Sequence, residues 1–158
     1  MRIRFFAALV ILCFIQVAVL DSVKLFGVKP DLLLLGAVAA AMVFKMERAL
    51  AFAALAGLLK DCFTADTFGT NTLLFPLWAF LIIRLLRSIS LETGLRLALL
   101  VLVTAVSQNL AVRMIKAFLG RGVPLGSTLR VLLFGSLYTA AVAYPAFELL
   151  KKRVRLRI

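Results

Sequence analysis

The sequence contains no histidine, and only two of its 158 residues are cysteines, Cys13 and Cys62. Histidine is the usual general base near neutral pH and the commonest metal ligand. The chain also lacks a phosphate-cradling glycine loop, a metal-ligand cluster, and a nucleophile accompanied by a base. We therefore predict that the protein is not an enzyme and that it binds no metal and no cofactor. Two isolated cysteines do not form a disulfide framework.

Acidic residues are also scarce: seven Asp and Glu stand against 19 Lys and Arg, which gives a formal net charge of +12. In a soluble protein this excess would indicate a nucleic-acid ligand. Here the basic residues lie in short segments between apolar runs and at the C-terminus, and no aromatic residues are interleaved with them. We expect no nucleic-acid binding, and we expect anionic lipid to contact the basic tail that begins at Lys151.

Hydrophobic residues, by contrast, are abundant: they make up 64% of the chain, and the mean hydropathy is +1.10. Charge separates the apolar runs instead of following one face of each run, so we predict a single domain, residues 1–158, that crosses the bilayer. The predicted fold class is all-α, a polytopic membrane protein with six transmembrane helices. The predicted spans are residues 5–20, 32–44, 49–59, 72–86, 95–112 and 128–150.

The distribution of Lys and Arg predicts the orientation in the membrane. Placing both termini in the cytoplasm puts the larger share of basic residues on the cytoplasmic side, as the positive-inside rule requires. The predicted location is therefore the bacterial inner membrane, with a multi-pass topology. The connection from Arg113 to Arg130 is an exception, because it places basic residues outside. Either a protein partner binds them, or they lie in a helix extension at the lipid headgroups.

Residues 30–74 are the most informative stretch. The second and third predicted spans are short, and a tight charged turn from Lys45 to Arg48 joins them. Along both spans small residues recur every four positions. These rows include Gly36 with Ala40, and Ala53 with Gly57. Rows of small residues allow helix backbones to approach closely, so they predict either packing within the hairpin or an interface for a partner's helix.

Polar residues punctuate this apolar sequence. At the end of the third span, we predict that Asp61 accepts hydrogen bonds that hold the following loop, together with Gly69 and Asn71; a proton or ion site is the alternative. Within other spans, we predict that Gln16, Gln108 and Asn109 form contacts between helices. Thr104 and Gln108 share a helix face, which makes them candidate partners of Gln16.

Several features of residues 30–74 resemble the family of rod shape-determining membrane proteins named MreD. In that family a proline opens the second span, and a Gly-x-x-x-Asp element closes the third before a loop that contains a glycine. The matching features are the run Pro30-Asp31-Leu32-Leu33-Leu34-Leu35, the element Gly57-Leu58-Leu59-Lys60-Asp61, and Gly69. Lys60 departs from the pattern, because an apolar residue more usually precedes the aspartate. This departure argues against a neutral, dry Asp61.

The resemblance implies a non-enzymatic scaffold of the cell-elongation machinery, which synthesises peptidoglycan during rod-shaped growth. It implies binding to the transmembrane helix of an MreC-like single-span protein, within an assembly that includes RodA and a class B penicillin-binding protein. It also implies a fold similar to the substrate-binding components of energy-coupling-factor transporters. A vitamin-transporter component is therefore the alternative function, for which Asp66, Asn71 and Trp78 are the only compact set of pocket residues.

Overall fold

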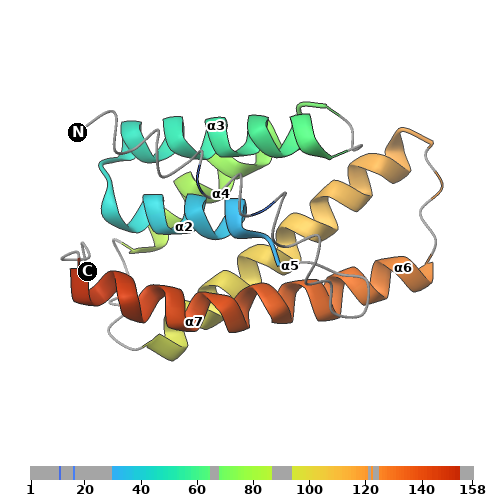
Figure 1. Ribbon diagram of the computed structural model, residues 1–158. Coiled ribbons are helices and arrows are strands. Elements are labelled where there is room, and N and C mark those ends of the chain that lie inside the picture. The colour runs from blue at the N-terminus through green and yellow to red at the C-terminus, as the bar shows by residue number, and fades with distance from the viewer. Residues whose placement is uncertain are drawn as a thin grey trace.

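The computed structural model describes residues 11, 16, 30–64, 68–86, 94–120, 122 and 125–153, and the regular elements within these ranges are all helices. In chain order they are α2 (Leu32–Val43), α3 (Met46–Phe63), α4 (Thr70–Leu86), α5 (Gly94–Phe118), α6 (Leu125–Arg130), the π-helical segment η2 (Val131–Gly135) and α7 (Ser136–Arg153). Figure 1 shows α6, η2 and α7 running as one long rod. Apart from Ile11 and Gln16, the first predicted span lies outside the described residues.

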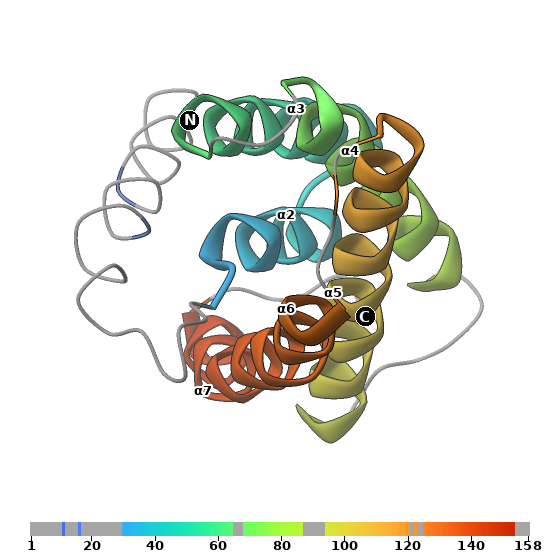
Figure 2. The ribbon, with the colours of Figure 1, turned by 90° about the vertical axis from the view of Figure 1, so that its right-hand side faces the viewer.

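Helix α2 forms the centre of the bundle. It contacts α3, α4, α5 and α7, and most of its side chains are buried. Figures 1 and 2 both show it lying between α3 and α7. Its 12 residues extend only about 18 Å, whereas the hydrocarbon core of a bilayer is about 30 Å thick. The longer neighbouring helices therefore surround a helix that is too short to span a bilayer alone.

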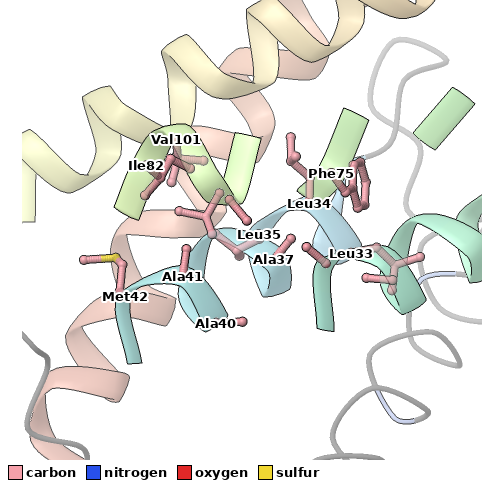
Figure 3. Packing of buried hydrophobic residues seen from close by; sticks show 14 of the residues in the cluster. Leu33, Leu34, Leu35, Ala37, Ala40, Ala41, Met42, Phe75, Ile82 and Val101 are labelled. Atoms are coloured by element: carbon pink, nitrogen blue, oxygen red, sulfur yellow. The ribbon is translucent and has the colours of Figure 1, made fainter. Parts of the chain in front are cut away.

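The apolar core is built around this central helix. In Figure 3, leucines of α2 point toward Phe75 and Ile82 of α4 and toward Val101 of α5. Phe75 and Val101 are completely buried, and both belong to the same hydrophobic cluster as the residues of α2. Truncating any of these side chains would leave a cavity in a closely packed interior. The α2 sequence thus makes a core helix that is apolar on all sides.

Helix α3 packs most extensively on α4 and then on α2. The small residues predicted to support close packing are all buried within the chain: Gly36, Ala40, Ala53 and Gly57. They therefore pack against other parts of the same chain, and in this structure none of them is exposed to a partner's helix.

The helix boundaries differ from the predicted spans most clearly at both ends of α3 and at the end of α5. Helix α3 starts at Met46, inside the stretch predicted as a turn, and it continues past Leu59 to Phe63. The polar residues at its end do not stop it, because their side chains find partners on α2 and α4, as described below. Helix α5 runs to Phe118 rather than ending at residue 112, and the chain turns at Gly120, where φ is +67°.

Two stretches in the described part of the chain are helical, long and apolar enough to cross a membrane: Leu95–Phe118 and Thr128–Glu148. Only 28% of the most apolar part of each is buried inside the protein. The shorter apolar helices are Leu32–Val43 and Thr70–Leu86. Large apolar side chains therefore cover the outside of the bundle, which is favourable in lipid and costly in water.

Candidate functional site

Polar side chains and backbone groups gather where α3 ends and where α2 and α4 begin. We call this group the polar layer. It comprises Gln16, Asp31, Lys60, Asp61, Gly69, Asn71, Thr72, Trp78, Gln108 and Thr139. These residues come from segments far apart in the sequence, and hydrogen bonds or ion pairs join them into two networks. Consecutive residues of α3, Lys60 and Asp61, belong to different networks, so α3 links the two.

The Asp61 carboxylate caps the start of α4. Its Oδ1 accepts hydrogen bonds from the backbone N–H and the side-chain amide of Asn71, at 3.1 and 2.8 Å. Its Oδ2 accepts from the backbone N–H groups of Gly69 and Thr72, at 3.0 and 2.9 Å, and from the Thr72 hydroxyl at 2.7 Å. The first N–H groups of a helix have no intrahelical acceptors, and a carboxylate is favourable beside them. These donors favour the ionised form of Asp61, which can only accept.

Gly57 lies one helical turn before Asp61 and faces the same part of α4. A Cβ atom at this position would lie 2.6 Å from the backbone carbon of Asn71 and 2.8 Å from the Cα of Thr72. These distances are too short for any side chain, so the backbones of α3 and α4 touch here because residue 57 is glycine. The two ends of the Gly-x-x-x-Asp element therefore act together, since glycine allows the approach and aspartate caps the helix that approaches.

Gln16 and Asp31 satisfy the start of α2. The Gln16 side chain donates to the Pro30 carbonyl oxygen at 3.2 Å and accepts from the Leu32 backbone N–H at 2.7 Å. Asp31 is the N-cap residue, and its Oδ1 accepts from the Leu34 N–H at 3.0 Å. Gln16 lies in the first predicted span, so the start of α2 is joined to a separate segment of the chain.

Asp31 also connects α2 to α3 and α7. Its Oδ2 forms an ion pair with Lys60, and its backbone N–H donates to the Thr139 hydroxyl of α7 at 3.1 Å. The Lys60 ammonium lies 5.1 Å from the centre of the Phe75 ring, which adds a cation–π contact with α4. Both charged side chains of the pair are largely buried, at 17% and 18% exposure. The pair thus compensates two charges inside a mostly apolar bundle.

The network that contains Asp61 extends from α4 to α5 through Gln108. Its side-chain amide nitrogen donates to Asn71 Oδ1 at 2.7 Å, and its Oε1 accepts from Trp78 Nε1 at 2.7 Å. Gln108 and Asn71 are almost completely buried. Because Asn71 also donates to Asp61, the contacts continue without interruption from α3 through α4 to α5.

The candidate partners of Gln16 are engaged elsewhere in the structure. Gln108 contacts α4, and the Thr104 hydroxyl donates to the Leu100 carbonyl oxygen at 2.7 Å within its own helix. Gln16 instead bonds to the backbone at the start of α2, where the first N–H groups have no acceptor within the helix. Asn109 does contact another helix, because its side chain donates to the Ser136 hydroxyl at 3.2 Å.

The structure adds polar-layer residues that the sequence pattern did not identify as site residues. Asp31, Lys60, Thr72 and Thr139 were not among the predicted site residues. For Asp31 the signal was present, because an aspartate directly before an apolar run is a typical N-cap. Nothing in the sequence indicated that Thr139 lies beside it. Asp66 and the tail beyond Arg153 lie outside the described residues.

The hydrogen-bonding groups of the polar layer bind one another. No group of three or more potential metal ligands occurs among the residues that the structure describes. Each charged or amide side chain in this layer instead has a partner on another segment, and this arrangement fixes the relative positions of the helices. The polar groups of this layer therefore hold the helices together through hydrogen bonds and the Asp31–Lys60 ion pair.

Comparisons with known proteins agree with the pattern in residues 30–74 and extend it. The family model described as rod shape-determining protein MreD matches residues 1–154. No curated protein and no solved structure gave a match. The family match is therefore not confined to the Gly-x-x-x-Asp element and its surroundings, because it covers nearly the whole chain.

Proposed function

This chain belongs to the MreD family of rod shape-determining membrane proteins, and we propose that it acts as a non-enzymatic scaffold for the machinery that elongates the cell. A role in rod shape determination follows from the family. The proposal adds the manner of action, which is recognition of other membrane proteins by helix faces. A scaffold of this kind needs a rigid bundle with apolar surfaces that other helices can contact.

The proposal is supported by a contrast between the inside of the bundle, where polar contacts join the helices, and its outside, where apolar side chains are exposed. Inside, the polar layer ties the helices together through bonds that involve α2, α3, α4, α5 and α7. Outside, α4 exposes a row of leucines spaced four residues apart: Leu73, Leu77, Leu81 and Leu85. A helix of a partner could pack along such a row without breaking any polar contact. This contrast is the observation that carries the proposal.

We further propose six membrane spans with both termini in the cytoplasm, in a fold similar to the substrate-binding components of energy-coupling-factor transporters. Support comes from the two long apolar helices and from the positions of basic residues at the ends of helices. The basic tail would then contact anionic lipid of the cytoplasmic leaflet.

The partner that we propose is the transmembrane helix of an MreC-like single-span protein, with RodA and a class B penicillin-binding protein in the larger assembly. The small residues on α2 and α3 do not serve this contact, because they are buried within the chain. We propose the exposed row of leucines on α4 as the surface for it. Packing a helix against leucine side chains relies on shape and dispersion, since lipid chains are as apolar as leucine.

The test is co-purification with an MreC-like protein in two forms. One form keeps its own transmembrane helix, and the control form carries an unrelated apolar helix of equal length. We expect the full chain to retain the first form and to lose the second. Exchanging Leu77 and Leu81 for alanine should weaken retention several-fold, whereas the same exchange at Leu99 and Val103 of α5 should not. Equal retention of both forms would refute recognition through the transmembrane helix.

The alternative, a vitamin-transporter component, predicts different companions. A bound vitamin and paired ATPases in the purified sample would support it and would count against the scaffold. Of its three predicted pocket residues, Asn71 and Trp78 both bond to Gln108 in the structure, so their polar groups are used within the chain.

A further inference from the structure

The rod that α6, η2 and α7 form contains a turn of π-helix. This turn is η2, Val131–Gly135, and α-helix precedes and follows it. A π turn joins residues five apart rather than four, so it holds one more residue than an α turn. Such turns are rare, and inside α-helices they are frequently found at functional sites. The extra residue changes how α6 is rotated relative to α7.

Two hydrogen bonds join the rod to α5, one on each side of η2. After η2, the Ser136 hydroxyl accepts from the Asn109 side chain at 3.2 Å. Before η2, the Thr128 hydroxyl accepts from Arg113 Nη1 at 2.8 Å. The two donors are four residues apart and share one side of α5. The two acceptors are eight residues apart, and eight residues of α-helix advance about 800°, which is about 80° past two full turns. In an uninterrupted α-helix the two hydroxyls would therefore face different directions.

The π turn corrects this rotation. Because it takes up one residue, the remaining seven advance about 700°, within about 20° of two full turns. Thr128 and Ser136 then both face α5, as their hydrogen bonds require. The same correction acts on the outside of the rod, where Leu129 and Leu137 are also eight residues apart. Their exposed fractions are nearly equal, at 59% and 61%, so with Leu133 between them they form one apolar row.

On the α7 side, η2 is firmly held. The Thr139 hydroxyl donates to the Gly135 carbonyl oxygen at 2.8 Å and accepts from the Asp31 N–H at 3.1 Å, which joins the end of η2 to the polar layer. Ser136 and Thr139 are both buried. Helix α7 is therefore fixed to α2 and α5.

On the α6 side, the surroundings are open. Helix α6 has six residues and packs mainly against η2, which continues it. Figure 1 shows it at one end of the rod, beyond the ends of α2 and α3. A Cβ added at Gly122 or Gly126 would meet nothing within 4 Å, and the chain turns at Gly120, where φ is +67°. Helix α6 can therefore rotate without displacing the core.

We propose that η2 is a conformational switch that rotates α6 about the axis of the rod. In one state the π turn is present and Thr128 bonds to Arg113. In the other state the segment is α-helical, α6 is rotated by about 100°, the rotation of one residue, and that bond is broken. Leu129 then leaves the row that it forms with Leu133 and Leu137.

Two opposing terms of modest size set the populations of these states. The α-helix is the commoner geometry and favours the second state, whereas the hydrogen bond to Thr128 favours the first. Helix α7 and the polar layer are the same in both states. The switch therefore changes the outer surface where α5 meets α6, and it does not depend on the proposed partner contact of α4.

The experiment measures distances between spin labels by double electron–electron resonance. The full chain carries Cys13→Ser and Cys62→Ser, and one label is placed on α3 by Leu58→Cys. The second label is placed on α6 by Leu129→Cys or, as the control, on α7 by Leu137→Cys. We expect the Leu137→Cys pair to give one distance and the Leu129→Cys pair to give two.

Variants then shift the two populations. Thr128→Val removes the hydroxyl, so the minor distance of the Leu129→Cys pair should increase several-fold. Deleting Leu133 in that variant should restore the major distance, because an α-helix with one residue fewer has the same rotation as the helix with the π turn. A single distance for the Leu129→Cys pair both with and without Thr128→Val would overturn the proposal. Equal changes in the Leu137→Cys pair would also overturn it.

Thermal unfolding provides the second measurement. Deleting Leu133 from the wild-type chain should change the melting temperature by less than about 2 °C, because the rod keeps both bonds to α5. Deleting Ala141, an exposed residue of α7, should lower it by more than about 5 °C, because the buried residues Thr139 and Phe147 are rotated apart. An equal loss in both deletions, or failure of the Leu133 deletion to fold, would overturn the proposal.

Discussion

At the scale of single residues, Asp61 is the most heavily used side chain in the described part of the chain. Both of its oxygens accept hydrogen bonds from the first residues of α4, and its donors include backbone and side-chain groups. A carboxylate in a mostly apolar bundle is stable only when such donors replace water. We therefore assign Asp61 a structural role. To serve as the proton or ion site that the sequence left open, Asp61 would have to lose hydrogen bonds to the start of α4.

We predict that Asp61→Ala lowers the free energy of unfolding in detergent by about 3 kcal/mol, because it removes a helix cap and leaves buried donors without acceptors. Asp61→Asn should have a smaller effect, since its one amide oxygen still accepts. Denaturation with sodium dodecyl sulfate measures both. Glu47→Ala, which changes an exposed acid on the same helix, should alter stability by less than about 0.5 kcal/mol. Equal stability of Asp61→Ala and Glu47→Ala would contradict the assignment.

At the scale of helices, the contact between α3 and α4 depends on a missing side chain. Gly57 allows the two backbones to touch, and Asp61 then lies within reach of the start of α4. The loop between the helices turns at Gly69, where φ is +91°, a value that favours glycine. Two glycines and one aspartate therefore determine how α4 returns against α3.

We predict that Gly57→Ala destabilises the bundle by about 1–3 kcal/mol, because the added Cβ would overlap the α4 backbone. This sign is opposite to helix propensity, which favours alanine over glycine by about 1 kcal/mol. The matched control is Gly126→Ala in α6, where an added Cβ meets nothing within 4 Å. That variant should be as stable as the wild type or slightly more stable. Thermal unfolding of the two variants measures the loss of stability in each. An equal loss in both would show that Gly57 has no special role.

At the scale of the whole molecule, the described bundle has an apolar outside and a polar layer buried near one set of helix ends. The exposed leucines of α4 and the low burial of the two long apolar helices agree with the membrane location of the MreD family. Lys45 and Cys62 lie near opposite ends of α3, and both are exposed. They can therefore report which end of the bundle faces the outside of the cell.

With both termini in the cytoplasm, we predict that a membrane-impermeant maleimide labels Cys62 in intact spheroplasts of a Cys13→Ser strain. A cysteine introduced by Lys45→Cys in a chain lacking both native cysteines should react only after permeabilisation. Mass spectrometry of the purified protein measures the labelling. Labelling of residue 45 in intact cells, with Cys62 protected, would reverse the proposed orientation.

Much of the fold could be predicted from the sequence because hydrophobicity and helix formation are local properties. The all-helical class, the short helix after Pro30 and the apolar α4 follow from composition and from runs of apolar residues. The ends of α3 and α5 could not be predicted as well. The polar side chains of Lys60 and Asp61 argued locally for an end at Leu59, and partners on α2 and α4 allow the helix to continue.

The sequence by itself determined the family and the helical class, because the Gly-x-x-x-Asp spacing and the apolar runs are visible in order along the chain. The tertiary structure alone decided which distant residues meet. It placed Gln16 at the start of α2, Thr139 beside Asp31, and Gln108 between Asn71 and Trp78. Hydrogen bonds of this kind depend on the packing of whole helices, and no local pattern specifies which partner lies across a helix interface.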